Sequence, residues 1–104
     1  MFQITFSPGK APLHMAALEG LVEAIEPLVK AGIDVNCKMR WSDGKEATPL
    51  HFAVVGNEPG AVSALLACGA DRAARGEFGE FAGTPWDFAE EAGTLPKSCV
   101  DSLR

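Results

Sequence analysis

A short motif recurs three times in this sequence, and its recurrence limits the possible folds more than any other feature. The copies read APLHMA, TPLHFA and TPWDFA, and they begin at Ala11, Thr48 and Thr84, which are 37 and 36 residues apart. A second element, x-Gly-x-Asp, starts 20 residues after each of the first two copies, at Ala31 and Cys68. Two markers that keep one register indicate a chain of repeated structural units.

The segments between the markers carry helical signals. Pro12 suits an early helical position, because its missing N–H would be unpaired there in any case, and Gly20 is expected to end the helix. The second unit repeats this pattern with a helix from Pro49 to Val55, and its next helix starts near Pro59 and ends at Gly69. Each of these units is therefore predicted to be a helical hairpin.

The second helix of the first unit is predicted from about residue 21 to residue 31, with Gly32 as its stop. Pro27 lies inside this segment, where it removes an interior N–H, so we expect it to bend or break the helix. The apolar residues of the segment have the spacing of a buried stripe. This stripe consists of Val22, Ile25, Leu28 and Val29.

These residues resemble the ankyrin repeat family, whose unit opens with Thr-Pro-Leu-His-x-Ala and closes its second helix with Leu-Leu-x-x-Gly-Ala-Asp. The resemblance covers about residues 8–104, and the second unit matches best, at Thr48, Pro49, Leu50, His51, Ala53, Val62, Leu65, Leu66, Gly69, Ala70 and Asp71. It implies an all-α solenoid of about three helix-turn-helix repeats linked by extended β-hairpin fingers.

With 104 residues, the chain is expected to form a single ankyrin-repeat domain, residues 1–104. Phe2, Ile4 and Phe6 alternate with polar residues, which predicts a strand beside the first hairpin or over the open face of the first repeat. The expected parts are an N-terminal capping segment (1–10), a first repeat with a long finger (11–47), a second repeat with a long finger (48–83) and a truncated C-terminal capping repeat (84–104).

The chain departs from the family pattern in its first and third units. Ala11 replaces the opening Thr, so the hydrogen bond between that hydroxyl and the motif His is available only between Thr48 and His51. We expect the first unit to be looser for this reason. In the third unit Trp86 replaces the motif Leu and Asp87 replaces the His, which is typical of a terminal repeat whose outer face meets water.

The first two repeats, at 37 and 36 residues, are longer than the family's unit of ~33 residues, and this added length is expected to lengthen both fingers. The helical parts align without gaps, so the extra residues fall in segments 36–47 and 73–83, with Asp43 expected near the first tip. The finger aromatics are Trp41, Phe78 and Phe81, which either fold back on the stems or form a contact surface. Trp41 follows Arg40, a typical interface composition that favours contact; for Phe81 both alternatives stay open.

The resemblance also implies where a partner would bind, since ligands in this family contact the fingertips and the exposed face of each first helix. The matching helix positions are Leu18 and Glu19, Val55 and Gly56, and Glu91 and Ala92. Leu18 and Val55, together with Trp41, predict a continuous apolar groove with an acidic rim. The candidate partner-binding residues are Arg40, Trp41, Asp43, Lys45, Leu18, Glu19, Val55, Phe78, Phe81 and Glu91.

Composition argues against several classes of protein. Nine Lys and Arg against fourteen Asp and Glu give a net charge of −5, with no block of either sign, which disfavours nucleic acid as a partner. No apolar run approaches the ~20 residues that span a bilayer, and the N-terminal segment has no secretory signal. Three cysteines without a CxxC pair fit a reducing compartment, so we expect a cytoplasmic protein.

No catalytic constellation can be assembled from these residues. His14 and His51 are the only histidines, and the repeat motif accounts for both, so we expect no catalytic residue, cofactor or metal. The sequence therefore predicts a non-catalytic protein-interaction module, a monomer or weak homodimer, that binds a protein partner through its concave face and fingers as an adaptor or inhibitor. The alternatives are a self-associating structural protein that uses its exposed aromatics and, last, an enzyme with an unrecognised site.

Overall fold

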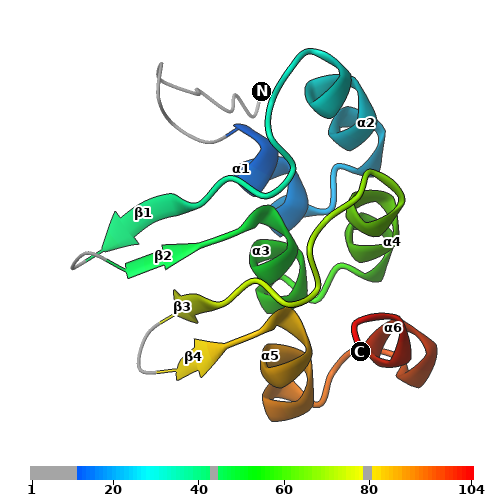
Figure 1. The fold of residues 1–104 in the computed structure, drawn as a ribbon. Helices are drawn as coiled ribbons and strands as arrows, with labels where there is room; N and C mark the ends of the chain where they lie inside the picture. Colours follow the sequence, from blue (N-terminus) through cyan, green and yellow to red (C-terminus); the bar gives the residue numbers. More distant parts are fainter. Residues whose placement is uncertain (1–11, 43–44, 79–80) are drawn as a thin grey trace, which may run out of the picture.

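Pairs of α-helices alternate with β-hairpins along the chain (Figure 1). The computed structural model describes residues 12–42, 45–78 and 81–104, without the side chains at positions 41, 42 and 78. Within these ranges the helices are α1 (Pro12–Glu19), α2 (Val22–Lys30), α3 (Pro49–Val55), α4 (Pro59–Ala67), α5 (Pro85–Ala92) and α6 (Lys97–Ser102). The strands are β1 (Met39–Ser42), β2 (Lys45–Ala47), β3 (Gly76–Phe78) and β4 (Phe81–Gly83).

The helices form two columns, and the hairpins project from one of them (Figure 1). Helices α1, α3 and α5 pack on one another as an inner column, and α2, α4 and α6 form the outer column. Antiparallel β1–β2 is the first finger, antiparallel β3–β4 is the second, and β2 lies beside β3. The predicted all-α solenoid of helical hairpins with β-hairpin fingers is confirmed. The strand expected at Phe2, Ile4 and Phe6 lies outside the described residues.

The core runs between the two helix columns. The inner helices contribute Leu13 and Leu50, both almost fully buried, and the outer helices contribute Ile25 and Leu65. Small residues let neighbouring helices approach closely, and they include Ala16, Ala17, Ala53 and Ala61. Leu103 closes the last repeat with only 1% of its surface exposed, so the short α6 completes the core of the terminal unit.

The ends of the inner helices agree with the sequence signals. Helix α3 begins at Pro49 behind Thr48, whose hydroxyl accepts the backbone N–H of His51 at 3.4 Å, and it ends at Val55. Helix α1 ends at Glu19, and Gly20 adopts a φ of +72°, a left-handed conformation that costs glycine little because it has no Cβ.

Pro27 does not break α2, which continues from Val22 to Lys30. The expectation of a break is therefore wrong. A proline at this position leaves the carbonyl of Glu23 without its helical donor, but Glu23 is exposed, so water can take the place of that donor.

The predicted buried stripe of α2 is only partly correct. Ile25 is fully buried and Leu28 and Val29 are half-buried, but Val22 is 42% exposed. The residue that faces Val22 from α4 is Gly60, where an added Cβ would lie 3.1 Å from the Val22 Cγ2 atom. Because Gly60 has no side chain to cover Val22, the first residue of the stripe stays open to solvent.

None of the helices in the described residues could cross a bilayer, since the longest, α2 and α4, have 9 residues each.

Candidate partner-binding surface

His51 connects the second repeat to the finger that follows it. Its Nε2 atom lies 2.9 Å from the carbonyl oxygen of Gly83, so this nitrogen carries the proton and donates it. The Thr48 hydroxyl lies 2.7 Å from Nδ1 and therefore donates to it. Burial lowers the pKa of His51, which keeps the ring neutral at pH 7, and the two hydrogen bonds fix this tautomer.

His14 plays the same part in the first repeat but has one partner fewer. Its Nε2 atom donates to the carbonyl of Ala47 at 2.9 Å, whereas its buried Nδ1 has no partner in the described residues. Position 11 is Ala, so the sequence supplies no hydroxyl where the second repeat has Thr48. Burial lowers the pKa of His14 to about 4, so this ring is also neutral at pH 7.

The two histidine rings also join successive repeats. His14 packs edge-on against Phe52 and His51 packs edge-on against Phe88, each with a centroid separation of 5.0 Å. Gly76 of the second finger lies over the His51 ring, where an added Cβ would come within 2.9 Å of Nε2. Each histidine therefore fixes a finger stem and the next inner helix together, and the surface they carry is ordered before a partner arrives.

One hydrogen bond joins the bases of the two fingers, and an ion pair lies within the first finger. The Asn36 side-chain oxygen accepts the backbone N–H of Asp71 at 2.7 Å, across one full repeat. On the first finger Arg40 pairs with Glu46 at 3.3 Å, and the Arg40 side chain is 72% exposed. An exposed pair of this kind contributes at most about 1 kcal/mol, so Arg40 can exchange it for a partner's carboxylate at little cost.

The predicted helix positions lie at the C-terminal ends of the inner helices. Val55 is 43% exposed, and Leu18 is half-buried against the core. Gly56 follows Val55 and approaches the carbonyl of Leu18 so closely that no side chain would fit there. The ends of α1 and α3 are thus in direct contact, as the repeat register requires.

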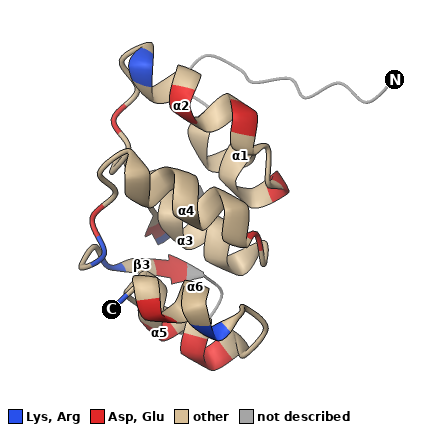
Figure 2. Ribbon diagram, turned by 90° about the vertical axis from the view of Figure 1, so that its right-hand side faces the viewer, with Lys and Arg blue, Asp and Glu red and all other residues tan. Residues whose placement is uncertain are grey.

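Acidic residues occupy the matching register positions on the two inner helices next to α3. Glu19 and Glu91 are exposed on α1 and α5, and the Glu58 carboxylate lies against Gly20 in the turn after α1. Figure 2 shows further Asp and Glu positions distributed along the helix columns. The inner-helix surface, which we define as Leu18, Glu19, Val55, Glu58 and Glu91, thus presents an apolar side chain among carboxylates.

The finger residues predicted to bind a partner are only partly described. Lys45 is half-buried at the start of β2. Asp43 and the side chains of Trp41 and Phe78 lie outside the described residues, so the groove that joins Trp41 to Leu18 and Val55 stays a prediction. Phe81 is half-buried and packs edge-on against Phe88 at 4.8 Å, which places it with the finger stem.

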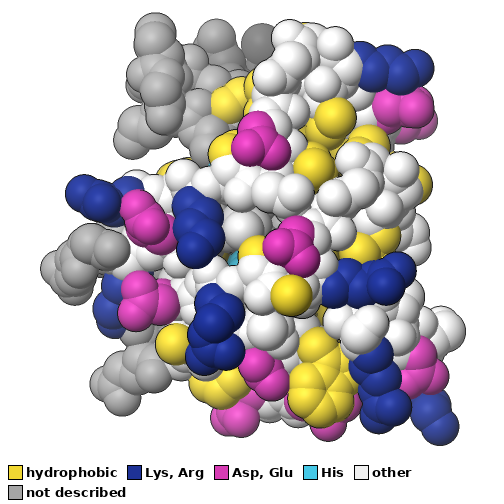
Figure 3. All heavy atoms as spheres, in the orientation of Figure 1, with side chains coloured by type: hydrophobic (Ala, Val, Ile, Leu, Met, Phe, Trp, Pro, Cys, Tyr) yellow, Lys and Arg dark blue, Asp and Glu magenta, His cyan; other side chains and the backbone are white. Residues whose placement is uncertain are grey.

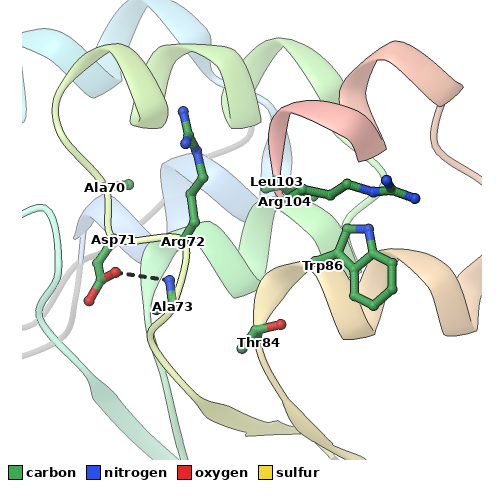
Figure 4. Close-up of a pocket in the computed structure, with 8 residues that line it drawn as sticks. All are labelled: Ala70, Asp71, Arg72, Ala73, Thr84, Trp86, Leu103 and Arg104. Carbon is green, nitrogen blue, oxygen red and sulfur yellow. Dashed lines mark hydrogen bonds between the residues drawn. The ribbon is translucent and has the colours of Figure 1, made fainter.

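Sequence reasoning missed a cavity of about 840 Å³ between the loop that precedes β3 and helices α5 and α6 (Figure 4). Trp86 of α5 and the buried Leu103, the residue after α6, border it, and Arg72 and Arg104 lie at it as well. The sequence signal for this cavity is Trp86, which replaces the motif Leu but by itself indicates only a terminal repeat. The opposite wall depends on where α6, a helix of six residues, packs in the folded protein.

The described residues offer little for catalysis. They contain no group of three or more His, Cys, Asp or Glu side chains placed to hold a metal ion. Both histidines are buried in structural hydrogen bonds, and burial raises the pKa of the Cys37 and Cys99 thiols, which disfavours the nucleophilic thiolate.

Comparison with known proteins agrees with this geometry. A family model described as "Ankyrin repeats (3 copies)" matches residues 3–76. Protein phosphatase 1 regulatory subunit 27 of Mus musculus is 38% identical over 93 residues, 89% of this chain and 49% of that protein. The Homo sapiens protein of the same name is 38% identical over 72 residues, 69% of this chain and 44% of that protein. The chain thus spans about half the length of these curated relatives.

Among solved structures, the human ASB11 ankyrin repeat domain matches with a TM-score of 0.67 and 30% sequence identity. The match covers 89% of this chain and 38% of that one, so the similar part includes nearly all of the helix pairs and fingers described above.

Proposed function

We propose that this chain, which belongs to the ankyrin repeat family, is a non-catalytic module that binds another protein through its inner-helix surface and fingers. Ankyrin repeats are protein-interaction modules, and the relatives named above are regulatory subunits. The observation that carries the proposal is Val55, a large apolar side chain that is 43% exposed at a register position where the family binds ligands.

The chemistry of this surface indicates what a partner should bring. Burying the exposed part of Val55 contributes up to roughly 1 kcal/mol, a fraction of the value for a whole side chain. Glu19 and Glu91 lie exposed on the neighbouring helices and would favour basic groups in the partner. The matching segment is therefore an apolar side chain flanked by Lys or Arg.

The fixed geometry supports binding rather than turnover. His14 and His51 use their ring protons to hold finger stems, so neither is available as a general base without releasing a finger. A surface held in place by such contacts loses little conformational entropy when a partner docks. This favours a role as an adaptor or inhibitor. The cytoplasm stays the location that the sequence predicts.

The names of the relatives suggest the first partner to test, the catalytic subunit of protein phosphatase 1. Purified catalytic subunit would be passed over the immobilised chain and over a Val55→Asp variant. We expect Val55→Asp to weaken binding by at least about tenfold, because it places a further carboxylate among the existing ones.

Ser63→Asp is the matched control. Ser63 is exposed on the outer helix α4, so this substitution adds the same charge at a different surface. Equal binding by wild type and Val55→Asp would contradict the inner-helix surface as the binding site. An absence of binding by the wild-type chain would contradict the phosphatase as the partner.

A further inference from the structure

The cavity beside α6 lies apart from the inner-helix surface and has its own chemistry. Its accessible apolar wall consists of Ala70, Ala73 and Trp86, beside the buried Leu103, and two arginines, Arg72 and Arg104, flank that wall. Figure 3 shows hydrophobic side chains over this end of the molecule next to Lys and Arg side chains. At about 840 Å³, the cavity is large enough for several side chains of a peptide.

The two arginines approach the cavity from different elements. Arg72 extends from the loop before β3 along α4, and Arg104 extends across the indole of Trp86 (Figure 4). The Arg104 guanidinium carbon lies 5.7 Å from the Trp86 ring centroid, within the range of a cation–π contact. Neither arginine side chain has an ion-pair partner in the described residues. Two cations thus flank an apolar wall with their charge uncompensated.

Most of the polar side chains at this cavity are hydrogen-bond donors. The indole N–H of Trp86 is buried and has no acceptor in the described residues. The Thr84 hydroxyl already donates to the Asp87 carboxylate at 3.0 Å. Asp71 is the one acidic lining residue, and its carboxylate accepts the backbone N–H of Ala73 at 2.9 Å and points away from Trp86 (Figure 4). A ligand that fits this cavity should bring acceptors with negative charge.

We propose that this cavity is a second docking surface, which takes an extended acidic segment of a partner protein. An apolar side chain of the segment packs on Trp86 and Ala73, and its carboxylates pair with Arg72 and Arg104. Charge complementarity supports this occupant. Arg72 and Arg104 have no ion-pair partner in the described residues, although the chain has a net charge of −5. The apolar wall favours a peptide over a polyphosphate or nucleic acid, because the peptide supplies an apolar side chain to pack there; the net charge would repel each of these anions at long range.

The test uses Trp86 as its own reporter. The chain has two tryptophans, so a Trp41→Phe variant leaves Trp86 as the only one. A short capped peptide in which Leu and Phe alternate with Asp and Glu would be added while Trp86 emission is recorded. We expect a saturable change at micromolar peptide, and none with the peptide in which Asn and Gln replace Asp and Glu.

Charge substitutions then locate the site. Arg72→Gln and Arg104→Gln should each weaken the peptide by roughly tenfold, the loss expected for a charge-assisted hydrogen bond. Lys97→Gln is the matched control, because Lys97 is exposed on α6 but does not line the cavity. Arg72→Gln alters only an exposed side chain, so its result holds even if Arg104→Gln perturbs the packing of Trp86.

Three outcomes would overturn the proposal: equal binding of the Asn and Gln peptide, unchanged affinity in both arginine variants, or stronger binding of single-stranded DNA than of the peptide. Val55→Asp separates this site from the inner-helix surface. It should leave peptide binding at the cavity intact, so failure of either site is seen independently of the other.

Discussion

The first and second repeats place a histidine at the same position, yet within the described residues only the second gives both ring nitrogens a partner. His51 bonds the Thr48 hydroxyl on one side and Gly83 on the other, whereas the part of the chain that the structure describes leaves His14 Nδ1 unpaired beside the Nε2 bond to Ala47. A buried polar group without a partner costs about 1–3 kcal/mol. The difference shows that the contact to the finger is retained even where the local contact within the repeat is absent.

The third repeat extends this comparison. Asp87 stands in the histidine position and accepts the backbone N–H and the hydroxyl of Thr84 at 2.9 and 3.0 Å. These bonds lower the pKa of Asp87. Asp is too short to reach a finger, and none follows α5 and α6 in the described residues. In the described residues, each histidine thus holds the stem of a finger, whereas Asp87 caps α5.

Truncating the core of the two repeats should give the largest effect. Leu50→Ala and Leu13→Ala each remove a fully buried side chain, and each should lower the free energy of unfolding by ~2–5 kcal/mol. Leu50→Ala should cause the larger loss of unfolding free energy, because α3 packs against both α1 and α5. Urea unfolding followed by circular dichroism measures both. A transition in two steps would show that the repeats unfold independently.

Acidification should weaken the protein through the histidines. The folded-state pKa of His14 is about 4, below the unfolded value of 6.5, so its contribution is complete above pH 6.5 and is lost as the pH falls towards 4. Between pH 7 and pH 5 this amounts to about 2 kcal/mol, and the lowered pKa of His51 acts in the same direction. Unfolding free energies that do not change over this range would contradict the neutral, buried rings.

Thr48→Ala should make the second repeat resemble the first. The substitution removes the hydroxyl that donates to His51 Nδ1 and that caps α3, so the free energy of unfolding should fall by ~1–3 kcal/mol. Thermal unfolding measures the change, and Thr48→Ser, which keeps a hydroxyl, is the control. If Ala and Ser lower stability equally, the hydrogen bond is not the cause.

Ala11→Thr is the reverse experiment and should have the smallest effect. By the repeat register, a threonine at position 11 offers His14 Nδ1 the hydroxyl that Thr48 offers His51, so stability should rise by ~1 kcal/mol. The ¹⁵N chemical shift of His14 Nδ1 reports directly whether the new bond forms. An unchanged shift would mean that the hydroxyl does not reach the ring.

Local signals were enough to predict most of the fold. The motif starting at Thr48 predicted α3 with its observed bounds, and Gly20 marked the end of α1, because capping and glycine effects act within a few residues. The exposure of Val22 depends on Gly60 in the next repeat, and periodicity within one helix contains no information about that neighbour. Periodicity likewise contains no information about the solvent exposure around Pro27, which lets α2 continue through it.

The candidate sites were predictable to different degrees. Register alone placed Val55 at an exposed position, since equivalent positions of stacked repeats share one face. The cavity at Trp86 could not be predicted, because it forms between segments that are about thirty residues apart and depends on where α6 packs. The sequence shows that Trp86 replaces the motif Leu, but the cavity beside it depends on contacts between distant segments.

Hydrogen exchange of the chain with and without the phosphatase catalytic subunit tests the central claim, that partners bind the inner-helix surface and fingers. The predicted result is slower amide exchange at the ends of α1, α3 and α5, around Glu19, Val55 and Glu91, with little change in α2 and α4. Slower exchange confined to the outer helices α2 and α4 would contradict it.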